Sequence, residues 1–191
     1  MTEYTAFIQR LNRTKTLSIK IGDAFLEGIR KNRFDAQETF LSPGSYAGSI
    51  YYIHSGIVRG SIEGPHEKVS TWFKQEGDII LPQGIFNQQA SEEYISSIAK
   101  TTLLSLSIKH IQKVVEAHSE ANELMLLLCN EKLLESQYRE KLLRLPSARD
   151  RYDFLANHED FVLKRIPHYL VASYLNVTKE TFSRLHKGLP Y

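Results

Sequence analysis

The spacing of apolar residues changes near residue 108, and the change separates two kinds of predicted structure. Between 39 and 107, short alternating or apolar runs are separated by turn residues such as Ser42-Pro43-Gly44. Short runs punctuated by glycine and proline are typical of antiparallel strands in a barrel or jelly roll. We therefore predict a double-stranded β-barrel here. Leu and Ile at helical spacing over 11–29 predict a helix packed against it.

A long helix is predicted from 111 to 145, where Glu, Leu, Lys and Gln dominate and no glycine or proline precedes Pro146. Seven residues of this helix follow one another at alternating intervals of three and four positions, as in a heptad repeat: Leu124, Leu127, Glu131, Leu134, Tyr138, Lys141 and Leu145. Such a seam indicates a parallel dimer helix, so we predict a homodimer through 119–145. The alternative is that the helix packs against its own barrel, and such packing must account for some of these apolar residues.

Beyond the long helix, Ser147 and Asp150 have the spacing of a capping box, which predicts the start of another helix.

The pattern over 166–187 is that of a helix-turn-helix, whose second helix enters the DNA major groove. Pro167 suits a first turn, Asn176 tolerates the left-handed backbone of a tight turn, and Thr178 is a candidate N-cap for the second helix. The positions expected to face inward are Leu170, Val171, Tyr174, Leu175, Phe182 and Leu185. An ordinary helical hairpin is the alternative. The turn, cap and core residues together favour the DNA-binding motif.

The residues of the second helix and its cap that do not face inward form the predicted surface for double-stranded DNA. They are Thr178, Lys179, Glu180, Ser183, Arg184 and Lys187. We assign Arg184 to a base or phosphate contact and Lys179 to a phosphate. Thr178 would combine capping with a backbone contact, and Lys187 would add nonspecific attraction. The alternative for this surface is a solvated charged face.

The charge distribution adds a mild argument for nucleic acid. The net charge is +2, with 17 Lys and Arg against 17 Asp and Glu over 1–145 and 7 against 5 over 146–191. The surplus lies at the C-terminal end, but it is smaller than the basic stripe of a strong DNA binder. Affinity should therefore depend on dimerisation and fall readily with salt.

Composition and missing motifs argue against other classes. With 42% hydrophobic and 24% charged residues, and no apolar run long enough to span a bilayer, we expect a soluble cytoplasmic protein without a membrane partner. Cys129 is the only cysteine, which excludes an internal disulfide, and we expect it in the core. No His-x-His pair, Gly-x-Ser-x-Gly elbow or phosphate loop occurs. We therefore predict no enzyme activity, no metal and no cofactor.

The order of barrel, long helix and helix-turn-helix resembles the Crp/Fnr family of transcription regulators. Residues 55–59, Ser-Gly-Ile-Val-Arg, are similar to the turn ahead of the family's ligand site, and Gly77-Asp78 to the pair just before it. The resemblance implies an α+β chain with a cyclic-nucleotide-binding-like sensor barrel over 1–118, a dimerisation helix over 119–145 and an all-α DNA-binding domain over 146–191. It also implies that a signal in the barrel changes how the two long helices cross and so resets the spacing of the recognition helices.

The stretch after Asp78 departs from the cyclic-nucleotide binders of the family. They carry a Glu for the ribose hydroxyl and an Arg for the cyclic phosphate, whereas this chain has Pro82 at the first position and Glu93 at or next to the second. A carboxylate repels the phosphate that a guanidinium would bind, so we do not expect cyclic AMP to bind in the usual mode. The candidates to line a pocket for an uncharged or cationic small-molecule effector are Pro82, Gln83, Gly84, Glu93 and Tyr94, with Glu92 beside them. The alternative is that the pocket is lost and they form a solvated loop.

A second departure lies at the end of the sequence. The family's terminal domain usually continues into a β-hairpin wing, but only four residues follow Lys187. We therefore expect a helix-turn-helix without a wing, which makes fewer contacts with the DNA backbone and binds more weakly. The prediction is a homodimeric DNA-binding transcription regulator. The alternative is a ligand-binding or protein-interaction module whose helix-turn-helix has decayed.

Overall fold

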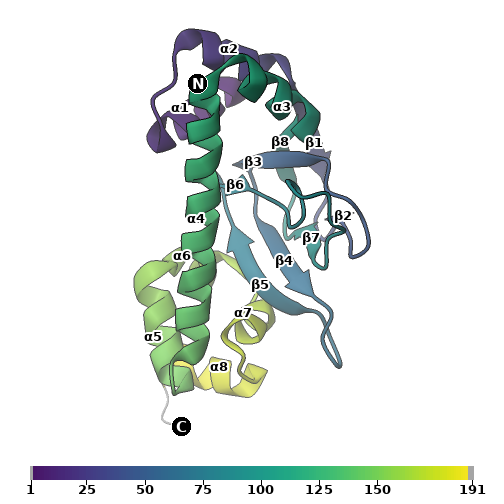
Figure 1. The fold of residues 1–191 in the computed structure, drawn as a ribbon. Coiled ribbons are helices and arrows are strands. Elements are labelled where there is room, and N and C mark those ends of the chain that lie inside the picture. The colour runs from purple at the N-terminus through teal and green to yellow at the C-terminus, as the bar shows by residue number, and fades with distance from the viewer. Residues whose placement is uncertain (1, 189–191) are drawn as a thin grey trace. The chain divides into compact units, whose positions relative to one another are not determined.

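The computed structural model describes residues 2–188, and its elements confirm the predicted α+β class, with antiparallel sheets and a long helix. The first part of the chain contains α1 (Glu3–Thr14), α2 (Ile19–Glu27), β1 (Ile29–Phe34), β2 (Thr39–Leu41), β3 (Ser49–Ser55), β4 (Val58–Ile62), β5 (Val69–Lys74), β6 (Ile79–Ile80), β7 (Tyr94–Ser97) and β8 (Thr101–Ser107). The second part contains α3 (Ile108–Ala117), α4 (Ser119–Arg144), α5 (Ala148–His158), α6 (Asp160–Arg165), α7 (His168–Leu175) and α8 (Lys179–His186) (Figure 1).

Packing divides the described residues into two compact units. The barrel unit comprises residues up to 59 together with 74–133, and the helical unit comprises 60–73 together with the residues from 134 onward. The boundaries predicted at 118 and 145 follow secondary structure, whereas these units follow tertiary contacts. The main difference is that residues 60–73, which contain most of the β4–β5 hairpin, pack with the C-terminal helices.

The barrel unit is built on an antiparallel sheet with strand order β1-β8-β3-β6. The central strand β8 pairs with β1 from Ile29↔Leu106 to Phe34↔Thr101, and on its other side it pairs with β3. In the same unit β2 pairs with β7. Leu104 and Leu106, two residues apart on β8, both lie in the hydrophobic core, as expected for one face of a strand.

Two helices that the apolar spacing predicts as continuous are interrupted. The helix predicted over 11–29 is wrong, because α1 ends at Thr14 and α2 begins at Ile19. In the link, the side chain of Asn12 accepts a hydrogen bond from the Leu17 amide at 2.8 Å, which replaces a helical bond. The helix predicted over 111–145 is likewise divided at His118, whose backbone is extended with φ −141° and ψ 103°.

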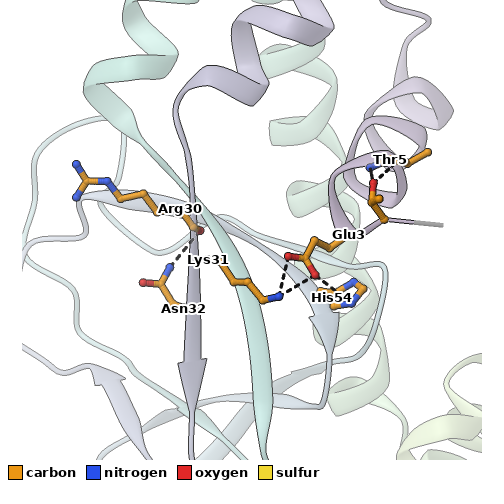
Figure 2. Close-up of polar contacts among 7 residues, drawn as sticks. Glu3, Thr5, Arg30, Lys31, Asn32 and His54 are labelled. Carbon is orange, nitrogen blue, oxygen red and sulfur yellow. Dashed lines mark hydrogen bonds and ion pairs between the residues drawn. The ribbon is translucent and has the colours of Figure 1, made fainter.

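Helix α1 is tied to the sheet and to α4 by polar contacts inside the barrel unit. Lys31 on β1 donates to both carboxylate oxygens of Glu3 at 2.7 and 2.8 Å, and His54 on β3 lies 3.9 Å from the same carboxylate (Figure 2). The hydrogen bond from Lys31 lowers the pKa of Glu3. At the other end of α1, Arg10 and Thr14 bind the Glu131 carboxylate on α4 at 2.5 and 2.6 Å.

These contacts change which face of α4 is available to a partner. Of the predicted seam, Leu124 is 1% exposed in the barrel core and Glu131 is held by α1, so these two residues do not face outward freely, whereas Leu134 in the helical unit is 55% exposed. The apolar residues that α4 exposes in this unit are Leu126, at 69%, and Leu133, at 54%. They are seven residues apart and lie on one side of the helix, with exposed Asn130 between them.

The helical unit has its own core and its own polar network. Fully buried residues from five helices form it: Leu142, Leu155, Val162, Val171, Leu175 and Phe182. The predicted capping box is confirmed, since Ser147 accepts from the Asp150 amide at 3.0 Å and Asp150 accepts from the Ser147 amide at 3.3 Å.

Tyr174 on α7 links α4 to the junction between α5 and α6. Its hydroxyl donates to Glu159 at 3.0 Å, and the guanidinium of Arg139 lies 3.9 Å from its ring centroid. Burial, assisted by the neighbouring Glu159, raises the pKa of Tyr174, so the hydroxyl stays protonated and acts as a donor. Burial lowers the pKa of Arg139, while Tyr174 and Glu159 oppose that effect.

We expect Tyr174→Phe to lower the free energy of unfolding by about 2 kcal/mol, because it removes a hydrogen bond to a charged group and leaves Glu159 without that donor. Urea denaturation followed by circular dichroism measures the loss. Tyr169→Phe, on the same helix but half exposed, is the matched control and should change stability by less than about 0.5 kcal/mol. Equal effects of the two substitutions would contradict the role given to the Tyr174 hydroxyl.

Candidate functional site

The first candidate site is built on the α7–turn–α8 segment. Asn176 adopts the predicted left-handed conformation, with φ 52° and ψ 52°, and the Val177 amide donates to the Ala172 carbonyl at 3.0 Å. Thr178 is the predicted N-cap of α8, and its hydroxyl accepts from the Thr181 amide at 3.1 Å. One local detail differs: Pro167 is the N-cap of α7 rather than its first helical residue.

The packing of α8 fixes which of its residues face outward. Phe182 and Leu185 are 1% and 2% exposed and hold the helix against the rest of the unit. Of the predicted outer residues, Ser183 is half-buried and the others are exposed: Thr178, Lys179, Glu180, Arg184 and Lys187. All six therefore lie on or beside one accessible surface of α8 and its cap.

The charges on this surface favour an anionic partner. The side chain of Arg184 makes no hydrogen bond or ion pair with any residue that the structure describes. Lys179 lies 3.7 Å from Glu67 on the β4–β5 hairpin, in an ion pair whose two side chains are both more than half exposed. The amide groups in the first turn of α8 add partial positive charge next to Lys179. Together these groups can bind a phosphate backbone, with Arg184 further along the helix available for a base or a second phosphate.

The second candidate site is a cavity of about 460 Å³ inside the barrel unit. It is lined by four of the predicted effector-pocket residues, Pro82, Gln83, Gly84 and Glu93, while Tyr94 is not among its lining residues. The remaining lining residues are Leu81, Ile85, Phe86, Asn87, Cys129 and Lys132. Sequence reasoning missed the two residues of α4, because no local pattern relates a helix to a loop so far away in the chain.

The loop along this cavity is held in a defined shape. Gly84 has φ 77°, and a Cβ atom there would lie 2.1 Å from the Gln89 carbonyl oxygen, so only glycine fits. The Gln83 amide donates to Glu93 Oε1 at 3.4 Å, and the Glu92 amide donates to the Gln83 side chain at 3.2 Å. Such internal bonding argues against the alternative of a fully solvated loop.

The polar groups of the cavity define its chemistry. Glu93 is only 8% exposed, so its negative charge is weakly screened by solvent. Burial raises the pKa of the Cys129 thiol, which leaves little reactive thiolate at neutral pH. The cavity therefore combines an apolar wall with hydrogen-bonding groups, the Glu93 carboxylate and the Lys132 side chain, so that an anion would meet a carboxylate on the Glu93 side.

Residues 2–188 are the part of the chain that the structure describes. Within that part of the chain, no group of three or more His, Cys, Asp or Glu side chains is arranged to hold a metal ion. None of the described helices is long and apolar enough to cross a membrane.

The fold is shared with known regulators, although no protein-family model and no curated protein matches the sequence. FixK2 from Bradyrhizobium japonicum matches with a TM-score of 0.72 at 16% identity, over 84% of this chain and 83% of that one. The c-di-GMP responsive global regulator CLP from Xanthomonas campestris matches at 0.69 and 17% identity, over 90% and 91%. A CooA variant from Carboxydothermus hydrogenoformans matches at 0.65 and 19% identity, over 85% and 77%.

These three proteins are regulators of the Crp/Fnr family. The chain therefore has the Crp/Fnr fold, which confirms the resemblance seen in the sequence at the level of architecture. At identities below 20%, the likeness concerns the fold, and the chemistry of the two sites has to be argued from this chain's own residues.

Proposed function

We propose that the protein is a DNA-binding transcription regulator of the Crp/Fnr type that acts as a homodimer. The observation that carries the proposal is the exposed surface of α8, where Arg184 has no partner among the described residues and Lys179 and Lys187 lie on the accessible side. The left-handed turn and the Thr178 cap support the interpretation of α7 and α8 as a helix-turn-helix. The fold shared with FixK2, CLP and CooA supports the same class.

In this proposal two copies of α8 enter successive major-groove faces, about 34 Å apart. Arg184 contacts a base edge or a phosphate, Lys179 contacts a phosphate, and the exposed Glu180 and half-buried Ser183 lie beside them. Thr178 fixes the start of the helix and contacts the backbone. Lys187, at the end of α8, adds attraction that does not depend on sequence.

Arg184→Ala is expected to weaken binding to a preferred duplex by roughly tenfold or more without unfolding the protein, because Arg184 is exposed and its contact is with DNA. The duplex is first selected from a random library, and affinity is then measured by gel-shift titration. Arg30→Ala, which removes an exposed arginine from β1, is the charge-matched control. Unchanged affinity in the Arg184 variant would contradict its assignment. A wild-type protein that shows neither salt-dependent binding nor sequence preference would favour a protein-interaction module with a decayed motif.

We further propose that the barrel cavity binds an effector other than a cyclic nucleotide. The support is Glu93, a buried residue that lines the cavity and that the sequence resemblance places at or next to the position of the family's phosphate-binding arginine. Pro82, which lacks both a carboxylate and a backbone donor, lines the same cavity. The cavity thus lacks the usual ribose and phosphate ligands and favours an uncharged or cationic molecule.

Calorimetric titration with cyclic AMP is expected to show no binding at millimolar ligand, because the Glu93 charge repels the cyclic phosphate. Glu93→Gln removes the negative charge with little change in side-chain volume, so comparing it with the wild type tests whether that repulsion prevents cyclic AMP from binding. Saturable binding of cyclic AMP to the wild-type protein, abolished by filling the cavity from its exposed lining residue with Asn87→Trp, would overturn the proposed effector class.

Dimerisation is proposed through the exposed face of α4. Leu126 and Leu133 are seven residues apart, and Asn130 lies four residues after Leu126. This spacing matches a coiled-coil seam in which one polar residue fixes the register of the two helices. This seam lies beside the one that the sequence predicted, because Leu124 and Glu131 are engaged within their own chain.

We expect the wild-type chain to sediment at twice its mass of 22.0 kDa and the double variant Leu126→Glu/Leu133→Glu to sediment as a monomer. In the proposed dimer these two leucines face the partner helix, and replacing them with like charges on both helices opposes association. Tyr46→Glu, which alters an apolar residue that is 71% exposed elsewhere in the barrel unit, is the control and should leave the dimer intact. A double variant that remains dimeric would exclude this face as the interface.

A further inference from the structure

We propose that the β4–β5 hairpin inhibits DNA binding by the helices against which it packs. In this arrangement, which we call the clasp, the Glu67 carboxylate pairs with the Lys179 ammonium group until a DNA phosphate displaces it. The hairpin here means residues 60–73, which belong to the helical unit. The inference rests on the proposed DNA-binding function and adds a regulatory contact to it.

The base of the hairpin is firmly bound to α7. Ser70 is fully buried, its amide donates to Ser173 Oγ at 3.0 Å, and its hydroxyl donates to the Leu170 carbonyl at 3.2 Å. The ring of Phe73 packs edge-on against Tyr174 with 5.2 Å between ring centroids. Because these groups are buried and satisfied, the hairpin is part of the core of the helical unit, beside α7 (Figure 1).

The tip of the hairpin makes a looser contact. Glu67 lies 3.7 Å from Lys179, and their side chains are 60% and 57% exposed. Between the tip and the two helices lies an open cleft of about 480 Å³. Glu67 and Val69 line it on the hairpin side, and the lining residues of α7, the turn and α8 are Tyr169, Ala172, Ser173, Asn176, Val177, Thr178, Lys179 and Glu180. An exposed ion pair across such a cleft is weak and screened by salt, so a stronger anion can replace it.

The chemistry at this point makes the contact inhibitory. Lys179 is the first residue of α8, where the free amides of the helix attract phosphate. Glu67 satisfies the same ammonium group and places a negative charge where the DNA backbone would approach. DNA binding must therefore break the ion pair and also overcome repulsion from the carboxylate. A firm base with a displaceable tip is the arrangement that a clasp requires.

The test measures affinity for the selected duplex at low salt. Glu67→Gln is expected to bind twofold to fivefold more tightly than the wild type, the range that an exposed ion pair contributes. Glu63→Gln removes an equal charge from the same hairpin and should have a smaller effect, since Glu63 is not paired with Lys179 in the structure. In a Lys179→Gln background, the gain from Glu67→Gln should disappear. Circular dichroism verifies that every variant is folded.

The outcomes separate the clasp from the function on which it rests. If the wild type binds DNA but Glu67→Gln binds no more tightly, the clasp is overturned and the regulator proposal stands. The same holds if Glu63→Gln gives an equal gain, or if the gain persists without Lys179, because the effect is then general electrostatics. If no folded variant binds any duplex, the DNA-binding function is wrong and the clasp falls with it.

Discussion

The orientation of α8 depends on a short turn, and every contact proposed with DNA depends on that orientation. Asn176 reverses the chain through a left-handed conformation, and Thr178 starts the new helix by capping it. Once α8 begins there, burial of Phe182 places Arg184 on the opposite, accessible side. A helix that began one residue earlier or later would rotate by about 100° and exchange buried and exposed positions. The turn is therefore a condition for function as much as for folding.

Each of the two candidate sites, the barrel cavity and the start of α8, contains a carboxylate that would repel a phosphate group. Glu93 lines the barrel cavity, where we propose that it opposes an anionic effector, and Glu67 lies beside Lys179 at the start of α8. Their surroundings give them different effects. The buried Glu93 charge is weakly screened, so it acts as a selection between classes of ligand. The exposed Glu67 charge is screened and displaceable, so it adjusts an affinity rather than abolishing it.

Predictions from the sequence succeeded where a structure depends on residues a few positions apart. The turn at Asn176, the cap at Thr178 and the capping box at Ser147 are all of this kind. Helix continuity failed over 11–29, where apolar spacing carries no information about the competing side chain of Asn12. Contacts between distant segments gave no signal either: Ser70 and Ser173, which join the hairpin to α7, are 103 positions apart.

The small charge surplus and the clasp have a common consequence. With 7 basic against 5 acidic residues over 146–191, one copy of the proposed DNA-binding surface is expected to attract a duplex only weakly. Two linked copies bind far more tightly than one, because the second contact is made at a high effective concentration. In a dimer, a several-fold change in the affinity of one copy for its half-site also occurs in the other copy, so the affinity of the whole dimer changes by the product of the two. A weak ion pair such as Glu67–Lys179, insignificant in a strongly basic domain, is then large enough to regulate occupancy of a DNA site.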